Sequence, residues 1–222
     1  MDDLLRLEGV TLADAEGRNL FRHLDWHLPV GGRAVLHSGV DGHASAFLRL
    51  CAGLLHPEAG HVLLAGTPLG PYTFGHPFLA RGGLGWVPTE GGLLVNLSLR
   101  ANLALPLRFL RGHARLRAET LAQEGLERWE LASRADLRPH ALAPRERWLG
   151  ALLRAELLGP SLWLVDRPPG KLGSREQRLV ERHLQGAAAD PAIAFIGVGN
   201  GWQAFEGAEF HLEGGRLLPG GP

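Results

Sequence analysis

Lysine, cysteine, methionine and tyrosine are almost missing from this chain. Its 222 residues include one cysteine, one methionine, one tyrosine and one lysine, Lys171. A lone cysteine excludes an internal disulfide, and the apolar helical pattern around Cys51 predicts a buried structural thiol. Any chemistry that requires a lysine elsewhere in the chain is excluded as well.

An excess of charge of either sign is also absent. The 23 Lys and Arg residues balance 23 Asp and Glu residues, whereas a nucleic-acid-binding domain usually has a basic face. No window reaches the 18 or more apolar residues of a membrane span, and residues 1–10 are acidic and lack an apolar signal core. We therefore expect a cytoplasmic chain with no nucleic-acid partner, which could still sit on a membrane protein.

Short apolar runs alternate with helical patterns along the chain. Residues 161–166 and 192–198 are continuous apolar runs typical of parallel strands that are covered on both faces. Residues 174–190 lie between them and predict an amphipathic helix, so the three segments form a βαβ unit of an α/β core. The remaining predictions are strands at 4–13 and 24–39, the second broken at 29–32, a helix at 44–54, and a further strand that follows a turn within 56–66.

The middle of the chain, from about Pro71 to Arg138, has a different pattern. After a strand-like run that ends at Val87, it holds helical patterns at 97–110 and 114–131. We predict a mainly helical subdomain, about 71–138, inserted in a single domain that covers 1–222. The sequence contains no repeat, no low-complexity tract and no linker long enough to divide it.

Several stretches follow one another in a characteristic order. They read LRLCAGLLHPEAGHVLLAG, GWVPTEGGLLVNLSLRANLALPLRF, RPHALAPRERWLGALLRAELLGP, SLWLVDRPP, AIAFIGVGN and FHLEGGRL. In this order, and at nearly these distances, the chain resembles the ATPase subunits of ABC transporters over almost its whole length. The resemblance implies an α/β fold with a P-loop NTPase-like core, a mixed or parallel sheet, an N-terminal antiparallel β part and the inserted helical subdomain.

The phosphate loop of that family reads G-x-x-x-x-G-K-[ST], in which backbone N–H groups and the lysine hold phosphates and the hydroxyl binds magnesium. In register with the following helix, Ser38 and His43 fall on the two glycines, Ala44 on the lysine and Ser45 on the hydroxyl residue. We interpret the loop as a retained turn, with weak anion binding at the helix start as the alternative. The degenerate loop comprises Ser38, Gly39, Asp41, Gly42, His43, Ala44, Ser45 and Ala46.

The catalytic strand of the family ends in Asp-Glu, and here it ends in Asp166 and Arg167. The resemblance implies that the aspartate positions magnesium and that the glutamate polarises the attacking water. Arginine stays protonated and cannot act as a general base. We expect Arg167 to pair with Asp166, with a charge that fills a vacant phosphate position as the alternative. Ser45 and Asp166 are the predicted metal ligands if magnesium binds at all.

Other positions of the family's chemistry are also replaced. The glutamine that contacts magnesium and the permease falls on Thr89, and the switch histidine falls near Gly199. Gly173 replaces the aspartate of the loop after the catalytic strand. Leu12 and Asp14 are the nearest positions to the aromatic residue that stacks on adenine. Together these replacements affect every part of the site.

The signature loop, L-S-G-G-Q in the family, contacts the nucleotide of a partner subunit. Pro144 removes one amide donor, and Arg145 places a long side chain where glycine permits close approach. A homodimer would then have no competent site, and a heterodimer with an intact ATPase subunit would have two impaired ones. A basic helix start facing solvent is our interpretation, and Arg145 or Arg147 reaching a partner's nucleotide is the alternative. The signature-like residues are Leu142, Ala143, Pro144, Arg145 and Glu146.

The segment GGLLVNLSLRANLALPLRF resembles the ATPases of Mla and MCE-linked lipid transporters in particular. In the family it lies beside the coupling helix of the permease. We predict that residues 88–111 present apolar side chains to a membrane partner, with Thr89, Glu90, Leu93 and Leu94 as docking residues. The alternative is that these leucines pack the core of the subdomain.

These observations predict a catalytically degenerate ABC ATPase-like subunit, a scaffold or regulator docked on a permease at the inner face of the cell membrane, in lipid transport of the Mla type. It would form a homodimer or a heterodimer with another ABC ATPase subunit. We expect no cofactor, and at most weak binding of ATP and Mg²⁺. The alternatives are a divergent ATPase that uses Ser45 and Asp166, and a soluble protein that uses the fold for other binding.

Overall fold

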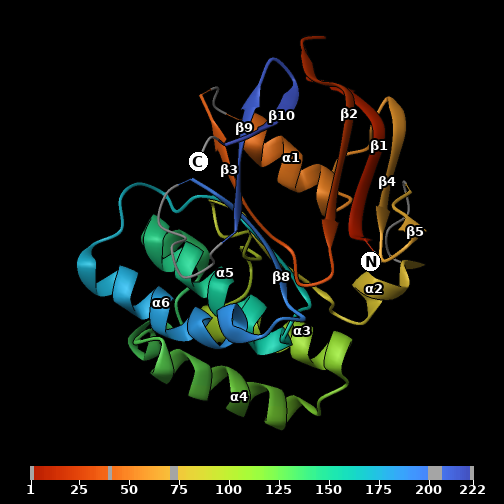
Figure 1. Cartoon of the computed structure of the whole chain (residues 1–222). Helices are drawn as coiled ribbons and strands as arrows, with labels where there is room; N and C mark the ends of the chain where they lie inside the picture. Colours follow the sequence, from red (N-terminus) through yellow and green to blue (C-terminus); the bar gives the residue numbers. More distant parts are fainter. Residues whose placement is uncertain (1–2, 40–41, 71–74, 200–206, 221–222) are drawn as a thin grey trace.

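The computed structural model describes residues 3–39, 42–70, 75–199 and 207–220, which form two sheets and the helices that cover them (Figure 1). The smaller sheet has four strands in the order β2-β1-β4-β5, and its pairs are antiparallel. It is the predicted N-terminal antiparallel part. Its strands are β1 (Asp3–Ala13), β2 (Asn19–Pro29), β4 (Ala59–Leu64) and β5 (Thr67–Pro68).

The larger sheet has six strands in the order β10-β9-β3-β8-β7-β6. All its pairs are parallel except the hairpin of β9 and β10, so the prediction of a mixed sheet is confirmed. The predicted βαβ unit is β7, α6 and β8. The strands are β3 (Arg33–Ser38), β6 (Leu84–Val87), β7 (Leu162–Val165), β8 (Ala194–Val198), β9 (Ala208–Glu213) and β10 (Arg216–Pro219).

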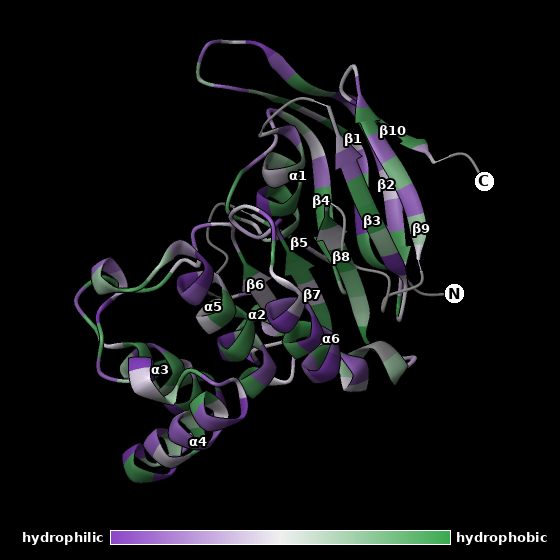
Figure 2. Ribbon diagram, turned by 90° about the vertical axis from the view of Figure 1, so that its left-hand side faces the viewer, coloured by the Kyte–Doolittle hydropathy of each residue, from purple (hydrophilic) through white to green (hydrophobic). Residues whose placement is uncertain are grey.

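Side chains of the larger sheet alternate between two cores. Leu162 and Leu164 pack with helix α1 (His43–Cys51), which lies between the two sheets. Trp163 and Val165 point the other way and pack with the larger helices. Because both faces are covered, the central strands consist almost entirely of apolar residues (Figure 2).

The remaining helices lie mainly on the second face of the larger sheet, with α4 farthest from the strands (Figure 1). Strand β6 falls within residues 71–138 but belongs to the larger sheet, so the helical part begins after Val87. The helices are α2 (Pro77–Ala80), α3 (Leu99–Arg111), α4 (Arg115–Arg128), α5 (Pro144–Leu158) and α6 (Ser174–Ala189), with short 3₁₀ turns η2 (Ala132–Arg134) and η3 (Pro139–Ala141).

Cys51 ends α1 and is fully buried between the sheets. Burial raises the pKa of its thiol because the thiolate would lose its hydration. The prediction of a buried structural thiol is therefore confirmed. Within the described ranges, no helix combines the length and the apolar character that crossing a membrane requires.

Candidate functional site

The loop that resembles a phosphate loop runs from the end of β3 into α1. Gly42 has a left-handed φ of 88°, a conformation that glycine adopts without strain, and its carbonyl oxygen accepts from the N–H of Ala46 at 2.8 Å. His43 is half-buried, whereas Ala44 and Ala46 are buried in the core around α1. The position of the family's lysine therefore holds a buried methyl group. Asp41 lies outside the described residues.

Ser45 and Asp166 are brought together by the fold although they are far apart in the sequence. The hydroxyl of Ser45 donates to Oδ2 of Asp166 at 2.6 Å, and the backbone N–H of Arg167 donates to Oδ1 at 2.8 Å. Both oxygens of this buried carboxylate are thus hydrogen-bonded within the chain. The backbone N–H of Arg167 is thus one of the two contacts, and an ion pair of its guanidinium with Asp166 stays a prediction.

These two oxygens are the ligand type that magnesium prefers, but they do not form a complete site. Magnesium usually binds one or two carboxylates and takes further ligands from phosphates and water. Here the Ser45 hydroxyl and the Asp166 carboxylate form a hydrogen bond with each other, and Ala44 supplies no charge that would hold a phosphate. Ser45 and Asp166 would thus supply two ligands of a magnesium ion, and phosphate or water would have to supply the others.

Trp148 forms a hydrogen bond with the residue that follows β7. This role was not predicted from the sequence. Its Nε1–H donates to the carbonyl oxygen of Asp166 at 3.2 Å, and the side chain is fully buried. The N–H of Asp166 donates to the carbonyl of Val87 at 2.8 Å. Since Trp148 lies on α5, it ties this helix to the strand end that carries Asp166. The only sequence signal is a tryptophan between charged residues and an apolar run.

A hollow of about 340 Å³ lies beside the loop, at the ends of β3 and β8. Among the described residues of its lining, Arg167 is the one arginine or lysine, and none is a carboxylate. Gly199, at the switch-histidine position, has a φ of 85° and donates its N–H to the carbonyl of Leu36 at 3.0 Å. The lining residues are Leu36, His37, Ser38, Gly39, Ala44, Arg167, Val198, Gly199 and His211.

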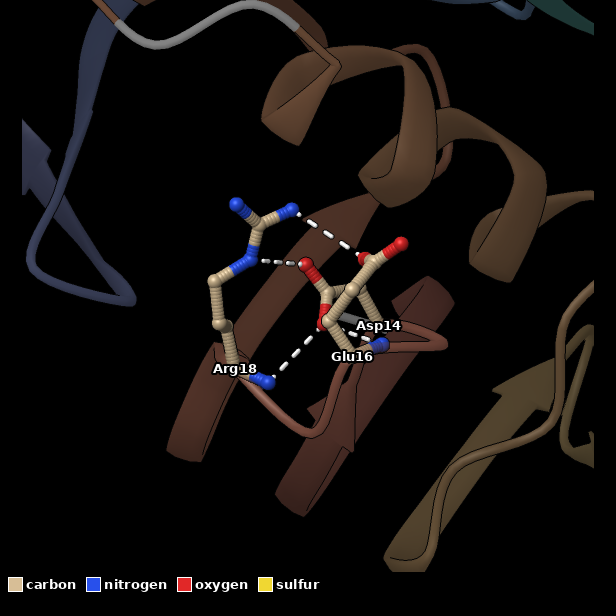
Figure 3. A network of polar contacts seen from close by, with 3 residues as sticks. All are labelled: Asp14, Glu16 and Arg18. Atoms are coloured by element: carbon tan, nitrogen blue, oxygen red, sulfur yellow. Dashed lines mark hydrogen bonds and ion pairs between the residues drawn. The ribbon is translucent and has the colours of Figure 1, made fainter.

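The turn between β1 and β2, where the family has its adenine-stacking aromatic, is closed by charged residues (Figure 3). Oδ2 of Asp14 accepts from Nε of Arg18 at 2.7 Å, and Oδ1 accepts from the N–H groups of Arg18 and Glu16. Desolvation acts to raise the pKa of Asp14, but the hydrogen bonds from Arg18 outweigh it and lower this pKa. The turn offers ion-paired polar groups in place of an aromatic face.

The signature-like residues form the start of α5, where Ala143 is the N-cap and Pro144 the first helical residue. Oε2 of Glu146 accepts from the N–H of Ala143 at 2.8 Å, and Oε1 accepts from Nε of Arg134 at 2.6 Å. Burial acts to raise the pKa of Glu146, but these hydrogen bonds more than offset it and lower the pKa. Leu142 is buried. The turn is thus stabilised by contacts within its own chain.

Two arginines of this turn also have partners within the chain. Arg145 forms an ion pair with Glu176 of α6, at an N–O distance of 3.4 Å. Arg147 donates to the carbonyl oxygen of Leu142 at 2.7 Å. Arg147 therefore ties α5 to the residue before its N-cap. Arg145, whose side chain is 45% exposed, faces both Glu176 and solvent.

The loop before α3 is organised by one buried amide that sequence reasoning missed. Oδ1 of Asn102 accepts from the N–H of Leu94 at 2.7 Å, and its Nδ2 group donates to the carbonyls of Leu94, Leu97 and Ser98 at 3.0–3.3 Å. Asn102 is 2% exposed. A single side chain therefore determines the path of the backbone from Leu94 to Ser98.

Arg154 of α5 holds the preceding part of this loop and was also missed. Its guanidinium donates to the carbonyls of Gly92 at 2.7 Å and Gly91 at 3.3 Å. Burial lowers the pKa of Arg154. A Cβ atom on Gly91 would lie 2.6 Å from the carbonyl oxygen of Arg147, so only glycine permits this close approach of loop and helix. One arginine within an apolar helical run is the signal that could have identified Arg154.

The predicted docking residues divide between the surface and the core. Leu93 is buried and packs with Leu99 and Leu103, as the alternative interpretation expected. Leu94 is 48% exposed, Glu90 is exposed and Thr89 is half-buried. Leu94 borders a groove of about 390 Å³ that is lined by Leu84, Gly85, Trp86, Gly92, Leu94, Asn102, Leu105, Pro106, Phe109, Arg154, Ala155 and Leu158. Phe109 of this lining is 74% exposed, and so is Val95, which follows Leu94 in the sequence.

Solved structures with the same fold include the ATP-binding cassette MJ0796. A dimeric post-hydrolysis structure of it, bound to ADP and Pi, matches with a TM-score of 0.83 over 96% of each chain at 20% identity. A second dimeric structure of MJ0796 also has a TM-score of 0.83, at 21% identity. The prediction of the fold class is thereby confirmed.

Curated relatives are more similar in sequence, although no family model matches the chain. The lipoprotein-releasing system ATP-binding protein LolD of Chromohalobacter salexigens is 32% identical over 222 residues, which cover 96% of this chain and 92% of the relative. The cytochrome c biogenesis ATP-binding export protein CcmA of Pseudomonas syringae is 34% identical over 80% of both chains. The chain therefore belongs to the ATP-binding subunits of ABC transporters.

Proposed function

We propose that this chain is a catalytically degenerate ABC subunit, a scaffold or regulatory component that docks on a membrane permease without hydrolysing ATP. The observation that carries the proposal is the state of the phosphate-loop site. Ala44, at the lysine position, is a buried methyl, and both carboxylate oxygens of Asp166 are hydrogen-bonded within the chain. Arg167 stands where the family's general base would be, and a guanidinium cannot accept the proton.

The other parts of the chemistry support the same proposal. Helix α5, which starts within the signature-like residues, begins with Pro144, which lacks an N–H, and Arg145 and Arg147 have partners within the chain. The turn at Asp14 has no aromatic face for a base. Electrostatic groups of the kind replaced here each contribute several kcal/mol to transition-state stabilisation, so their combined loss is incompatible with efficient turnover.

The groove supports the docking part of the proposal. Apolar side chains at Leu94, Val95 and Phe109 are exposed beside a groove whose backbone is fixed by Asn102 and Arg154. Exposed apolar surface around a groove is typical of protein interaction sites. We propose that a permease segment binds here, that the assembly lies at the inner face of the membrane, and that it contains a second ABC subunit.

We also propose that the transported material is lipidic, as in transporters of the Mla type. The relative LolD belongs to a lipoprotein-releasing system, whereas CcmA belongs to cytochrome c biogenesis. These two relatives belong to systems with different functions, so the proposal of a lipid cargo requires its own test. Lipids that co-purify with the native complex should be identified by mass spectrometry, and their absence would contradict the lipidic cargo alone.

The nucleotide part of the proposal is tested by adding Mg-ATP to the purified protein. We expect no shift of the melting temperature, whereas a ligand that binds the folded chain produces a shift that grows with its concentration. The second candidate function is a divergent ATPase, and the retained pair of Ser45 and Asp166 favours it. Phosphate release that disappears in Asp166→Ala would establish this candidate and overturn the proposal.

The docking part is tested by affinity purification of the native complex from membranes. We expect permease subunits and a second ABC subunit to accompany the wild-type chain. A Val95→Asp and Phe109→Asp variant should fold normally, because both side chains are exposed, and should lose the permease. The matched control is Val30→Asp with Leu116→Asp, since these exposed apolar residues lie outside the groove. Retention of the permease by the groove variant would contradict the docking site.

A further inference from the structure

The turn between α3 and α4 concentrates positive charge in a chain whose total charge is balanced. Residues 99–118 contain five arginines and neither Asp nor Glu, although the chain has 23 Lys and Arg residues and 23 Asp and Glu residues. Four of these arginines lie within residues 108–117, which end α3 and begin α4. We call this segment the arginine tip. It lies at the opposite end of the molecule from the hairpin of β9 and β10 (Figure 1).

Nearly every side chain of the arginine tip faces solvent. Its four arginines are exposed, and the exposed fractions of Phe109, Leu110 and Leu116 are 74%, 39% and 77%. The guanidinium of Arg108 lies 5.8 Å from the ring centroid of Phe109, so charge and aromatic surface adjoin. Large apolar side chains beside exposed arginines are typical of surfaces that lie in the interface of a membrane.

One carboxylate beside the arginine tip balances part of its charge. Oε1 of Glu119 forms an ion pair with Nε of Arg115 at 2.8 Å. The hydrogen bond from Arg115, together with the nearby arginine charges, lowers the pKa of Glu119. Glu119 is therefore ionised at neutral pH and compensates one arginine.

The other arginines of the tip have no such partner. The guanidinium of Arg111 donates to the carbonyl oxygens of Leu158 and Gly159, which carry no net charge. Within the described ranges, no carboxylate lies within ion-pair distance of Arg108, Arg111 or Arg117. The arginine tip thus keeps a net positive charge that contacts within the chain do not cancel.

The groove gives the arginine tip a position relative to a membrane. Phe109 belongs both to the tip and to the lining of the groove. A membrane protein seated in the groove would therefore hold the tip beside the bilayer. An acidic protein would also attract the arginines, but the exposed apolar side chains between them match the boundary of a bilayer, where they gain by leaving water.

We infer that the arginine tip binds the anionic headgroups of a membrane directly. The guanidinium groups bond to lipid phosphates, and the side chains of Phe109, Leu110 and Leu116 enter the boundary between headgroups and acyl chains. The negative surface of such a membrane attracts each nearby arginine. This contact requires no permease and is thus separate from the docking proposed above.

The test is flotation of the purified full chain with vesicles made of equal parts of phosphatidylglycerol and phosphatidylcholine, and with vesicles of phosphatidylcholine alone. We expect tighter binding to the anionic vesicles, which weakens as the salt concentration rises because salt screens exposed charges. The variant Arg108→Gln with Arg117→Gln should bind the anionic vesicles about tenfold more weakly than the wild type. Neither arginine lines the groove, so the variant leaves the groove intact.

The matched control is Arg178→Gln with Arg182→Gln, which removes the same charge from exposed positions on α6 and should bind like the wild type. Leu116→Ser tests the apolar part separately. It should weaken binding to the anionic vesicles by roughly threefold or more, because less apolar surface leaves water. All three variants change exposed side chains, so their melting temperatures should match that of the wild type.

Equal binding by the wild type and the Arg108 and Arg117 variant would overturn the inference, and so would an equal loss in the α6 control. A wild-type chain that does not float with the anionic vesicles would also overturn it and would favour an acidic protein as the partner of the arginine tip. Because the vesicles contain no permease, these results do not decide the docking proposal, which has its own test.

Discussion

The phosphate-loop side and the groove side of this molecule both depend on buried polar side chains, but with different results. At the phosphate loop, the side chains of Ser45 and Asp166 form a hydrogen bond with each other, so their polar atoms have partners within the chain. At the groove, Asn102 and Arg154 form hydrogen bonds with the backbone between Gly91 and Ser98, and the side chains of Leu94 and Val95 in that loop are exposed. The first arrangement stabilises the fold, whereas the second also presents a surface.

Replacing Asn102 by leucine should have the largest effect, because it leaves one N–H and three carbonyl groups of the loop without their buried partner. We expect a loss of about 3 kcal/mol in the free energy of unfolding, measured by urea denaturation. The control Asn96→Leu changes an exposed residue of the same loop and should cost less than about 0.5 kcal/mol. Similar losses in both variants would show that the amide does not organise the loop.

Arg154→Leu should cost about 2 kcal/mol, since two carbonyls lose their donor while a buried charge is removed. Hydrogen exchange of the amides near Gly91 and Gly92 should accelerate, and permease binding should weaken. Arg108→Leu is the control, because Arg108 is exposed on α3. If exchange in this loop is unchanged in Arg154→Leu, the guanidinium does not hold it.

Asp166→Ala should cost about 1.5 kcal/mol, because the Ser45 hydroxyl and the Arg167 N–H lose their acceptor. Permease binding should persist, since the groove does not contain this residue. Asp136→Ala removes an exposed carboxylate that pairs with Arg100, and should have a smaller effect on stability. Loss of permease binding in Asp166→Ala would mean that the two sides are not independent.

Glu146→Gln should have the smallest effect, about 0.5 kcal/mol at pH 7. Burial acts to raise the pKa of Glu146, but Arg134 and the N–H of Ala143 lower it below its usual 4.5. This stability is therefore present above pH 4.5 and is lost as the pH falls through the lowered pKa. Urea unfolding of wild type and variant should converge as the pH falls below this lowered pKa, and a difference that does not shrink with falling pH would exclude the carboxylate as its cause.

Local pattern was sufficient for most elements of the fold. The apolar runs that became β7 and β8 are buried on both faces, and the periodic pattern after Gly42 became α1, because these features depend on residues that are close in sequence. The place of β3 between β8 and β9 depends on pairing across more than half of the chain. Periodicity contains no information about such pairing.

The polar side chains that organise the site were harder to predict. Ser45 and Asp166 were identified through the family's motif, and the fold places them in contact. Asn102, Trp148 and Arg154 were missed because each acts on a backbone carbonyl or N–H, a partner that any residue type can supply. Leu93 and Leu94 are adjacent and chemically identical, and only the packing of α3 decides which one is exposed.

The amide of Asn102 separates the shape of its loop from the identity of the loop's outward side chains. It bonds backbone atoms of Leu94, Leu97 and Ser98, so substitutions at Leu94 or Val95 would leave those bonds in place. Evolution or a protein engineer could therefore alter the partner preference of this surface one side chain at a time, without redesigning the scaffold that displays it.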